Sequence, residues 1–235
     1  MTLTVSGDSG PLAGGNFVPP LPAGPAPAVQ TEFHWTPQPA DVGTWHLQFT
    51  ATDQIGQTTD CLVTIHVPAP SFLNFCVPGI NGVIPCPCSN PGDVGHGCDN
   101  SIGTGGALLE GFGTASLAAD TVHFTSSFER ATAFSLLLQA RGPTNNGVQF
   151  GQGVRCVSNT LKRLYVHTAV AGVVTYPQGT DLPVSAQSAV RGDVITAGEL
   201  RYYLSYYRDP VVQGSCNPAL QTYNSSQGMS VVWAP

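Results

Sequence analysis

The segment CPCSNPGDVGHGCDNS, residues 86–101, gathers side chains that could do chemistry: three cysteines, one histidine and two aspartates. A zinc site here would use Cys86, Cys88, His96 and Cys98. Structural zinc sites usually take cysteines in pairs with two to four residues between them, whereas only Pro87 lies between Cys86 and Cys88, and an oxidising compartment disfavours free thiolates. In an extended chain, Cys86 and Cys88 would also point to opposite sides. We therefore expect a disulfide-stapled, glycine-rich loop and no zinc.

Disulfide formation is the main chemistry that we predict for the cysteines. The chain has seven cysteines, so one of them has no partner within the chain. A bond between Cys156 and Cys216 would fasten the C-terminal tail to a sheet. The six cysteines that we expect in disulfides are Cys76, Cys86, Cys88, Cys98, Cys156 and Cys216.

Oxygen-bearing side chains in the same loop could hold a calcium ion. Asp93, Asp99 and Asn100 lie close together in the sequence, and calcium takes six to eight oxygen ligands from irregular loops. Their spacing differs from that of helix-loop-helix calcium sites. The alternative is that all three are solvated turn residues. We expect no other cofactor.

The composition excludes several classes of partner. Charged residues make up only 9% of the chain, the net charge is −6, and Lys162 is the single lysine. Nucleic acid and anionic membranes need clustered positive charge, which is absent. No apolar stretch approaches the roughly 18 residues that span a bilayer, so we expect no membrane insertion. Few charges, many turn residues and seven cysteines favour a secreted β-rich protein.

Residues 1–67 predict an N-terminal β-sandwich unit. TLTVSG, TEFHWTP, GTWHLQFTATD and TTDCLVTIHV alternate apolar and polar residues as strands do. The intervening GPLAGGNFVPPLPAGPAPA is too rich in glycine and proline for a helix or a central strand.

Part of this unit carries a family resemblance. The stretch FHWTPQPADVGTWHLQFTATDQIGQTTDCLVTIHV resembles the second half of a bacterial putative-Ig or cadherin-like repeat. The resemblance implies an Ig-like spacer or adhesive module, whose first half is short here. An incomplete unit could have lost an upstream partner of Cys61, so we expect Cys61 to be the unpaired cysteine. An incomplete unit could also expose open strand edges, through which two copies of the chain could pair.

A second β domain is predicted after a proline linker, PAPSF, at residues 68–72. Residues 73–235 contain strand-like runs such as DTVHFTSSF, TAFSLLLQA, LKRLYVHTAV and ELRYYLSYYRD, separated by turn residues. No window has sustained helical periodicity with caps. The expected fold class is therefore all-β, with an Ig-like sandwich followed by a disulfide-stapled β-sandwich or jelly roll.

The second domain also carries a resemblance, through FCVPGINGVIPCPCSNPGDVGHGCDNSIGTGGALLEGFG, GVRCV and DVITAGELRYYLSYYRDP. These stretches resemble a C-terminal module of large secreted bacterial surface proteins. The resemblance implies export and a β fold, and it implies no particular chemistry.

Two strands predict a surface of tyrosine and arginine. In RYYLSYY, Tyr202, Leu204 and Tyr206 share one face, and LKRLYVHTAV likewise has one apolar face. Rings stack on sugars while arginine and histidine donate hydrogen bonds to hydroxyls or carboxylates. If both sheet faces are covered, these side chains are core instead. The candidate ligand-binding residues are Arg163, Tyr165, His167, Arg201, Tyr203 and Tyr207.

Two short motifs favour ordinary structure over function. SGDSGPLAGG is similar to the nucleophile motif of trypsin-like proteases, but Ser9 opens the chain and lacks the surrounding sequence of that fold. The tripeptide from Arg191 to Asp193 reads RGD, which can mediate cell adhesion, yet it is also an ordinary turn before a strand.

The predicted function is that of an extracellular or cell-surface module without catalysis, which serves adhesion, assembly or glycan binding. Its partner would be a glycan or other surface polymer, or copies of itself through strand edges. The alternative is a secreted hydrolase of polysaccharides or esters. A concave site with convergent titratable groups would favour the hydrolase.

Overall fold

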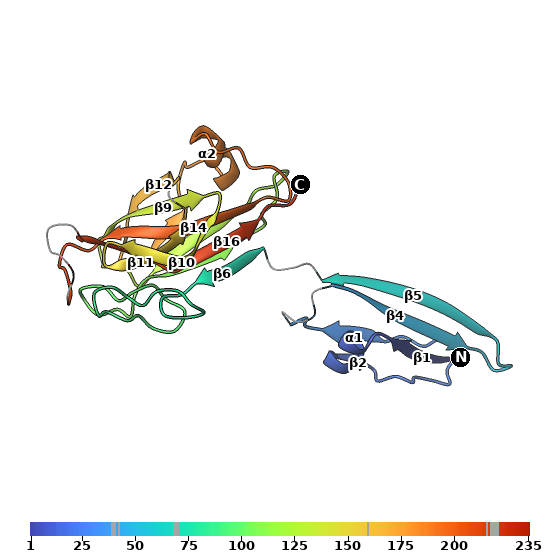
Figure 1. Ribbon diagram of the computed structural model, residues 1–235. Helices are drawn as coiled ribbons and strands as arrows, with labels where there is room; N and C mark the ends of the chain where they lie inside the picture. The colour runs from blue at the N-terminus through green and yellow to red at the C-terminus, as the bar shows by residue number, and fades with distance from the viewer. Residues whose placement is uncertain (39–40, 42, 68–70, 159, 215, 217–220) are drawn as a thin grey trace. The chain divides into compact units, whose positions relative to one another are not determined.

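Antiparallel strands dominate the computed structural model, which describes residues 1–38, 41, 43–67, 71–158, 160–214, 216 and 221–235. The all-β prediction is confirmed, since strands make up 45% of the residues. The chain divides into two units, Met1–Pro70 and Ser71–Pro235, which are drawn in Figure 1 and described separately below. Of the predicted linker, residues 68–70 lie outside the described residues, and Phe72 already begins a strand.

The N-terminal unit is built on a three-stranded sheet in the order β1-β4-β5. Its strands are β1 (Thr2–Gly7), β4 (Gly43–Thr52) and β5 (Thr58–Val67). Apolar side chains alternate along β4, so that Trp45, Leu47 and Phe49 share one face. Leu47 is fully buried there and pairs with Val63 of β5 in the register.

A short helix and an edge strand lie in the glycine- and proline-rich stretch, where we expected no helix, and the strand pairs with one that was predicted in TEFHWTP. They are α1 (Ser9–Gly14) and β2 (Gly15–Val18), which pairs with β3 (Glu32–Trp35). Pro11 is tolerated because it lies in the first turn, where backbone N–H groups have no intrahelical partner. The strand pair adds aromatic rings to the small core. The ring centroid of Phe17 lies 5.0 Å from that of Phe33 and 6.0 Å from that of Phe49.

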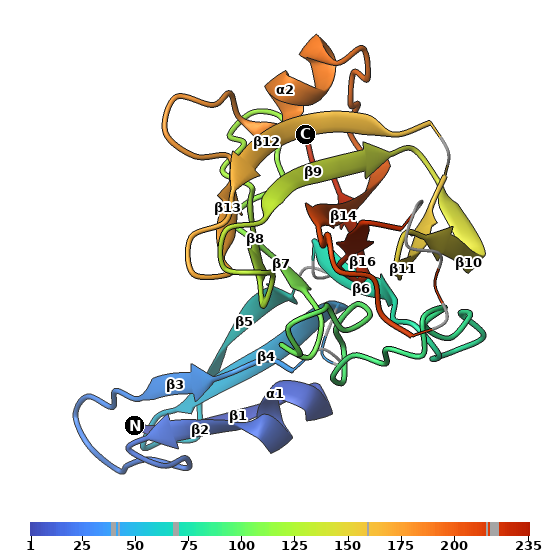
Figure 2. The same ribbon diagram turned by 90° about the vertical axis from the view of Figure 1, so that its left-hand side faces the viewer.

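The C-terminal unit contains a six-stranded and a three-stranded sheet, which Figure 2 shows on opposite sides of a common core. The larger sheet follows the order β12 (Lys162–Thr168), β9 (Phe134–Ala140), β14 (Leu200–Arg208), β16 (Gly228–Val232) and β6 (Phe72–Cys76), with β15 (Tyr223–Ser225) on β14. The smaller sheet follows the order β13 (Val174–Tyr176), β8 (His123–Ser127) and β7 (Leu108–Phe112). Between them lie fully buried rings, among them Phe124, Tyr176 and Trp233.

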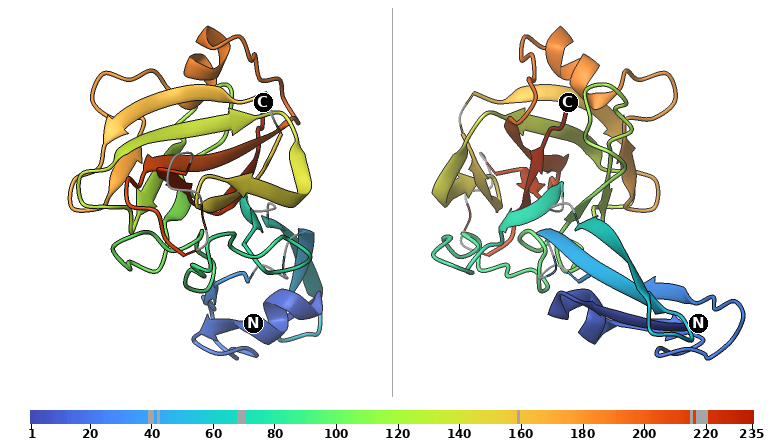
Figure 3. Two further views of the ribbon diagram at one scale, coloured as in Figure 1. Left: turned by 60° about the vertical axis from the view of Figure 1, so that its left-hand side comes forward. Right: turned by 90° about the vertical axis from the view of Figure 1, so that its right-hand side faces the viewer.

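The opposite face of the larger sheet is only partly covered. The hairpin of β10 (Pro143–Phe150) and β11 (Gly153–Val157), shown in yellow in Figure 3, packs against this face through a cluster that includes Val157 and Leu204.

A short helix, α2 (Val184–Val190), contacts β12 and buries Val184 and Ser188. We expected no helix here, because seven residues are too few to carry a clear helical period.

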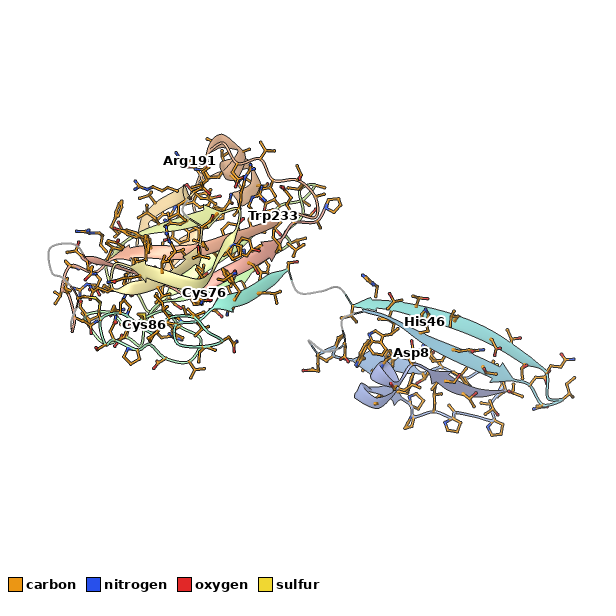
Figure 4. The ribbon with its side chains drawn as sticks, viewed as in Figure 1. Asp8, His46, Cys76, Cys86, Arg191 and Trp233 are labelled. Carbon is orange, nitrogen blue, oxygen red and sulfur yellow. A yellow bond between two sulfur atoms is a disulfide. The ribbon has the colours of Figure 1, made fainter. Side chains whose placement is uncertain are left out.

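Three disulfides staple the C-terminal unit, but one predicted pairing is wrong. The bonds are Cys76–Cys156, Cys86–Cys98 and Cys88–Cys216, so Cys156 and Cys216 do not pair with each other. The end of β6 meets β11 in a small buried cluster, which brings Cys156 to Cys76. Figure 4 labels Cys76 and Cys86. Cys61 is free and exposed.

The helices that the structure describes do not resemble membrane spans. α1 has six residues and α2 has seven, and neither has the length and apolar character that crossing a bilayer requires.

Candidate functional site

The predicted tyrosine and arginine surface does not form, because most of its side chains are core. Tyr203 and Tyr207 are fully buried, Tyr165 is 3% exposed and Arg201 is 2% exposed. The three tyrosines belong to the core between the two sheets of the C-terminal unit. The alternation in RYYLSYY was read correctly, but the face that carries Tyr203 and Tyr207 is the covered one.

Arg201 serves a buried ion-pair network and is no ligand-binding residue. Its guanidinium donates two 3.0 Å hydrogen bonds to the carboxylate of Asp193, which also accepts hydrogen bonds from Arg141 at 2.6 Å and Gln139 at 2.7 Å. Burial would raise the pKa of Asp193, but these partners outweigh burial and lower it. Asp193 is only 1% exposed. The RGD motif therefore presents Arg191, labelled in Figure 4, without an accessible carboxylate.

The other two predicted residues lie apart from each other. His167 bonds Asp181 through its Nε2 atom at 2.7 Å, and its ring stacks on Tyr176. Arg163 is exposed, and an irregularity in the register follows it, between Arg163 and Tyr165. Such an extra residue breaks the alternation of faces. Arg163 consequently lies on the opposite face of the sheet from Tyr165.

The loop of residues 86–101 holds disulfides, and the side chains of Asp99 and Asn100 form hydrogen bonds within the protein. Asp99 accepts hydrogen bonds from the backbone N–H groups of Asn100 and Gly105, and the Asn100 amide bonds Thr104 and the Phe128 carbonyl. Throughout the described part of the chain, no group of three or more histidine, cysteine or acidic residues could hold a metal ion. A calcium ion at Asp93, Asp99 and Asn100 therefore stays a prediction from the sequence.

The protease-like motif also lacks its machinery. The carboxylate of Asp8 lies 3.2 Å from Nδ1 of His46, and both side chains are about half exposed, at 43% and 48%. Among the described hydrogen bonds none joins the hydroxyl of Ser9 to His46. Figure 4 shows Asp8 and His46 in the N-terminal unit. A serine without a bonded base is not an activated nucleophile.

The best candidate site is a concave surface on the partly covered face of the larger sheet, which we call the aromatic groove. It encloses about 790 Å³. Strands β9, β12 and β14 provide its floor, and β10 and β15 add one ring each. The lining residues are Phe134, Leu136, Leu138, Phe150, Leu161, Arg163, Tyr206, Arg208 and Tyr223.

Three of these rings form a contiguous cluster. The ring centroids of Tyr206 and Tyr223 are 5.0 Å apart, and Phe150 lies 5.9 Å from Tyr206 and 5.1 Å from Tyr223. These distances are those of favourable aromatic pairs, which hold the rings in place. Phe134, on β9, remains 49% exposed. Phe150, Tyr206 and Tyr223 are half-buried, and the Arg155 guanidinium lies over the Phe150 ring, so solvent reaches these three rings only in part.

A second hollow continues the aromatic groove. It encloses about 500 Å³ and shares Phe134 and Arg208 with the groove, and it also contains Arg130. Arg130 lies 3.6 Å from the buried Asp209 and donates to Ser101. The two hollows therefore adjoin at Phe134 and Arg208.

The charges of the groove are all positive among the residues that line it. Arg163 and Arg208 are both exposed, and the lining contains no aspartate, glutamate, histidine or serine. General acid–base hydrolysis would need titratable groups converging on the substrate. The lining suits an anionic, ring-bearing ligand by its chemistry, and it contains no carboxylate or imidazole for acid–base hydrolysis.

The sequence held only part of the signal for this site. Alternation placed Tyr206 opposite Tyr203 and Tyr207, but on the face that we took to be the apolar, covered one. Tyr223 lies in a three-residue strand that no pattern had indicated. Phe150 comes from a hairpin that folds over the sheet, which local sequence does not reveal.

Comparison of the chain with protein-family models, with curated proteins and with solved structures finds no match. The aromatic groove must therefore be interpreted from its own residues.

Proposed function

We propose that this chain is an extracellular, non-enzymatic binding module, and that the aromatic groove holds an extended glycan bearing carboxylates. The observation that carries this proposal is the cluster of Phe150, Tyr206 and Tyr223 beside two exposed arginines. The groove stays open to solvent, as a site for a polymer must.

The chemistry of the lining supports this class of ligand. Aromatic faces stack on the apolar faces of sugar rings, and a guanidinium donates two parallel hydrogen bonds to a carboxylate. The chain has only eight lysine and arginine residues, so two of them in one groove without acidic neighbours favour an anion. The second hollow, reached past Phe134 and Arg208, gives room for a chain rather than a single sugar.

The covalent structure supports an extracellular location at a cell surface. Disulfides persist in oxidising compartments and are rare in the cytosol, and this unit has three. The resemblance to modules of secreted bacterial surface proteins points the same way, to adhesion through a surface polymer. A secreted hydrolase is the weaker alternative, because the lining of the groove provides no acid and base.

Alanine at Tyr206 and Tyr223 tests the stacking. Each ring should contribute about 1 kcal/mol, so the double variant should bind about 30-fold more weakly. Soluble polygalacturonate is the probe, with dextran as a neutral comparison, and affinity electrophoresis gives the dissociation constant. Arg163→Gln and Arg208→Gln should weaken binding of polygalacturonate selectively. Added salt should weaken it too, since these charges are exposed.

Arg191→Gln is the matched control, because it removes an exposed arginine outside the groove. It should bind as the parent does. Tyr203→Ala should instead lose about 3–5 kcal/mol of stability, since that ring is buried. The proposal fails if the Tyr206 and Tyr223 double variant is folded by circular dichroism and binds the acidic polymer as tightly as the parent. It also fails if the parent retains neither polymer.

A further inference from the structure

Strand β5 of the N-terminal unit has an open edge. It is the terminal strand of its sheet, and no described residue bonds to its outer side. By contrast, the outer edge of β1 is bridged at Leu3, which exchanges hydrogen bonds of 2.9 and 3.1 Å with Ala23. The side chains of β5 are mostly exposed, including Leu62 at 63% and Val63 at 39%. Open edges of this length are templates for pairing with another strand.

The register shows which backbone groups of β5 point outward. The N–H of Asp53 bonds the carbonyl of Gln57, which makes that pair a hydrogen-bonded one, and such pairs alternate along an antiparallel ladder. Counting along the pairing of β4 with β5, Cys61 and Val63 bond inward to β4. The N–H of Asp8 bonds the carbonyl of His46, so the backbone groups of His46 point toward β1. The neighbouring Leu47 must then point its backbone groups toward β5, which agrees with the inward bonding of its partner Val63.

The outward backbone groups therefore belong to the alternate residues of β5. These residues are Thr58, Asp60, Leu62, Thr64 and His66. Their N–H and C=O groups can bond only a strand that lies beyond β5.

An antiparallel copy of β5 can bond to these outward groups. With a twofold axis at Val63, Leu62 lies opposite Thr64 of the copy, and Asp60 lies opposite His66 of the copy. Both pairs are of the hydrogen-bonded kind, so the outward N–H and C=O groups of these four residues have partners. An axis at Leu62 also allows hydrogen-bonded pairs, but it places Asp60 opposite Thr64 and His66 opposite Thr58. The pairing of Asp60 with His66 therefore favours the axis at Val63.

The side chains fit the same register. Cys61, Val63 and Ile65 share the face of β5 that continues the buried face of β4. In the twofold arrangement Val63 meets its own copy, and Cys61 meets Ile65. On the other face, Asp60 of one copy and His66 of the other form a complementary pair at each end of the ladder. Each of these side chains already shares a hydrogen bond with a threonine of β4.

We propose that the N-terminal units of two copies of this chain join by antiparallel pairing of their β5 strands, with the twofold axis at Val63. The result is a continuous six-stranded sheet in the order β1-β4-β5-β5-β4-β1. This interface is independent of the aromatic groove, which lies in the other unit.

A charge reversal in the full chain tests the register. His66→Asp places an aspartate against Asp60 of the copy at both ends, and like charges in close contact cost several kcal/mol. We expect the dimer to dissociate at least tenfold more readily in sedimentation velocity from micromolar to millimolar concentrations. The double variant Asp60→Lys with His66→Asp places a lysine against an aspartate and should restore the dimer. A parent that stays monomeric at millimolar concentration overturns the proposal, as does a dimer that His66→Asp leaves unchanged.

Cysteine crosslinking tests the axis without altering charge. In a Cys61→Ser background, Val63→Cys should form an intermolecular disulfide with oxidised glutathione, because directly opposed non-hydrogen-bonded residues have Cα atoms about 4.5 Å apart. Leu62→Cys is the matched control and should crosslink poorly, since its copy lies diagonally across the ladder. In the parent, Cys61 should not link to Cys61. Equal crosslinking at positions 62 and 63, or a Cys61–Cys61 bond in the parent, overturns the register.

Discussion

Glu129 is a buried carboxyl at the centre of a serine cluster in the C-terminal unit. Its Oε1 atom accepts hydrogen bonds from Ser126 at 2.6 Å, Ser205 at 2.7 Å and Ser135 at 2.9 Å, while Oε2 has no partner among the described residues. Burial raises the pKa of Glu129 to about 7, although the three hydroxyls oppose the shift. Between about pH 4.5 and pH 7, the folded protein therefore keeps a proton on Glu129 that the unfolded chain has released.

We expect Glu129→Gln to remove a pH dependence of stability. The pKa is raised in the folded state, so the parent is most stable below about pH 4.5 as far as this group is concerned, and it loses stability as the pH rises toward and through 7. The loss should be at most about 3 kcal/mol, from a shift of about two and a half pH units. Urea denaturation of parent and variant between pH 5 and pH 8 measures the difference. A parent and a variant with parallel pH profiles would show that Glu129 is not protonated in the fold.

At the scale of the elements, the disulfides hold segments that bury little apolar surface. Cys86–Cys98 closes the loop that precedes β7 across 12 residues, and Cys88–Cys216 ties the same loop to the segment after β14 across 128 residues. In the chain-entropy model, a crosslink stabilises by restricting the unfolded chain, and a longer closed loop gives more stability. The two bonds should therefore contribute unequally although they begin two residues apart.

Replacing both cysteines of each bond with alanine tests this expectation. The Cys86→Ala and Cys98→Ala pair should lose about 3 kcal/mol, and the Cys88→Ala and Cys216→Ala pair about 4 to 5 kcal/mol, both from loop length. Guanidinium denaturation of the two variants gives the ranking. An equal or reversed loss would mean that local packing, rather than loop length, sets the contribution of each bond.

At the scale of the whole molecule, the two units draw on different sources of stability. Among the described residues of the N-terminal unit, Leu47 is the one fully buried aliphatic side chain, and the single cysteine of the unit is free. The C-terminal unit has an extensive buried core and all three disulfides. Small cores give marginal domains, so the N-terminal unit should be the weaker one.

Calorimetry of the full chain should show two transitions, with the N-terminal unit unfolding first. A reducing agent should lower only the upper transition, because every disulfide lies in the C-terminal unit. A fragment of residues 71–235 should reproduce that upper transition alone. A single transition that shifts as a whole on reduction would contradict this division of stability.

The sequence alone determined the features that depend on local pattern. Alternation along GTWHLQFTATD and RYYLSYY predicted strands, because side chains of a strand point alternately to two faces. Composition predicted an all-β fold, and seven cysteines predicted disulfides with one left over, which is Cys61. The two short helices were not predicted, because six or seven residues are too few to show a helical periodicity.

The tertiary structure alone decided which face of each strand is covered and which cysteines meet. Alternation separates Tyr206 from Tyr203 and Tyr207, but only the second sheet, packed against one side, makes the latter two core and leaves Tyr206 in the groove. Likewise, Cys76 and Cys156 are 80 residues apart, and only the approach of β6 to β11 brings them together. Both outcomes depend on contacts between distant segments, and a local pattern of residues carries no information about those contacts.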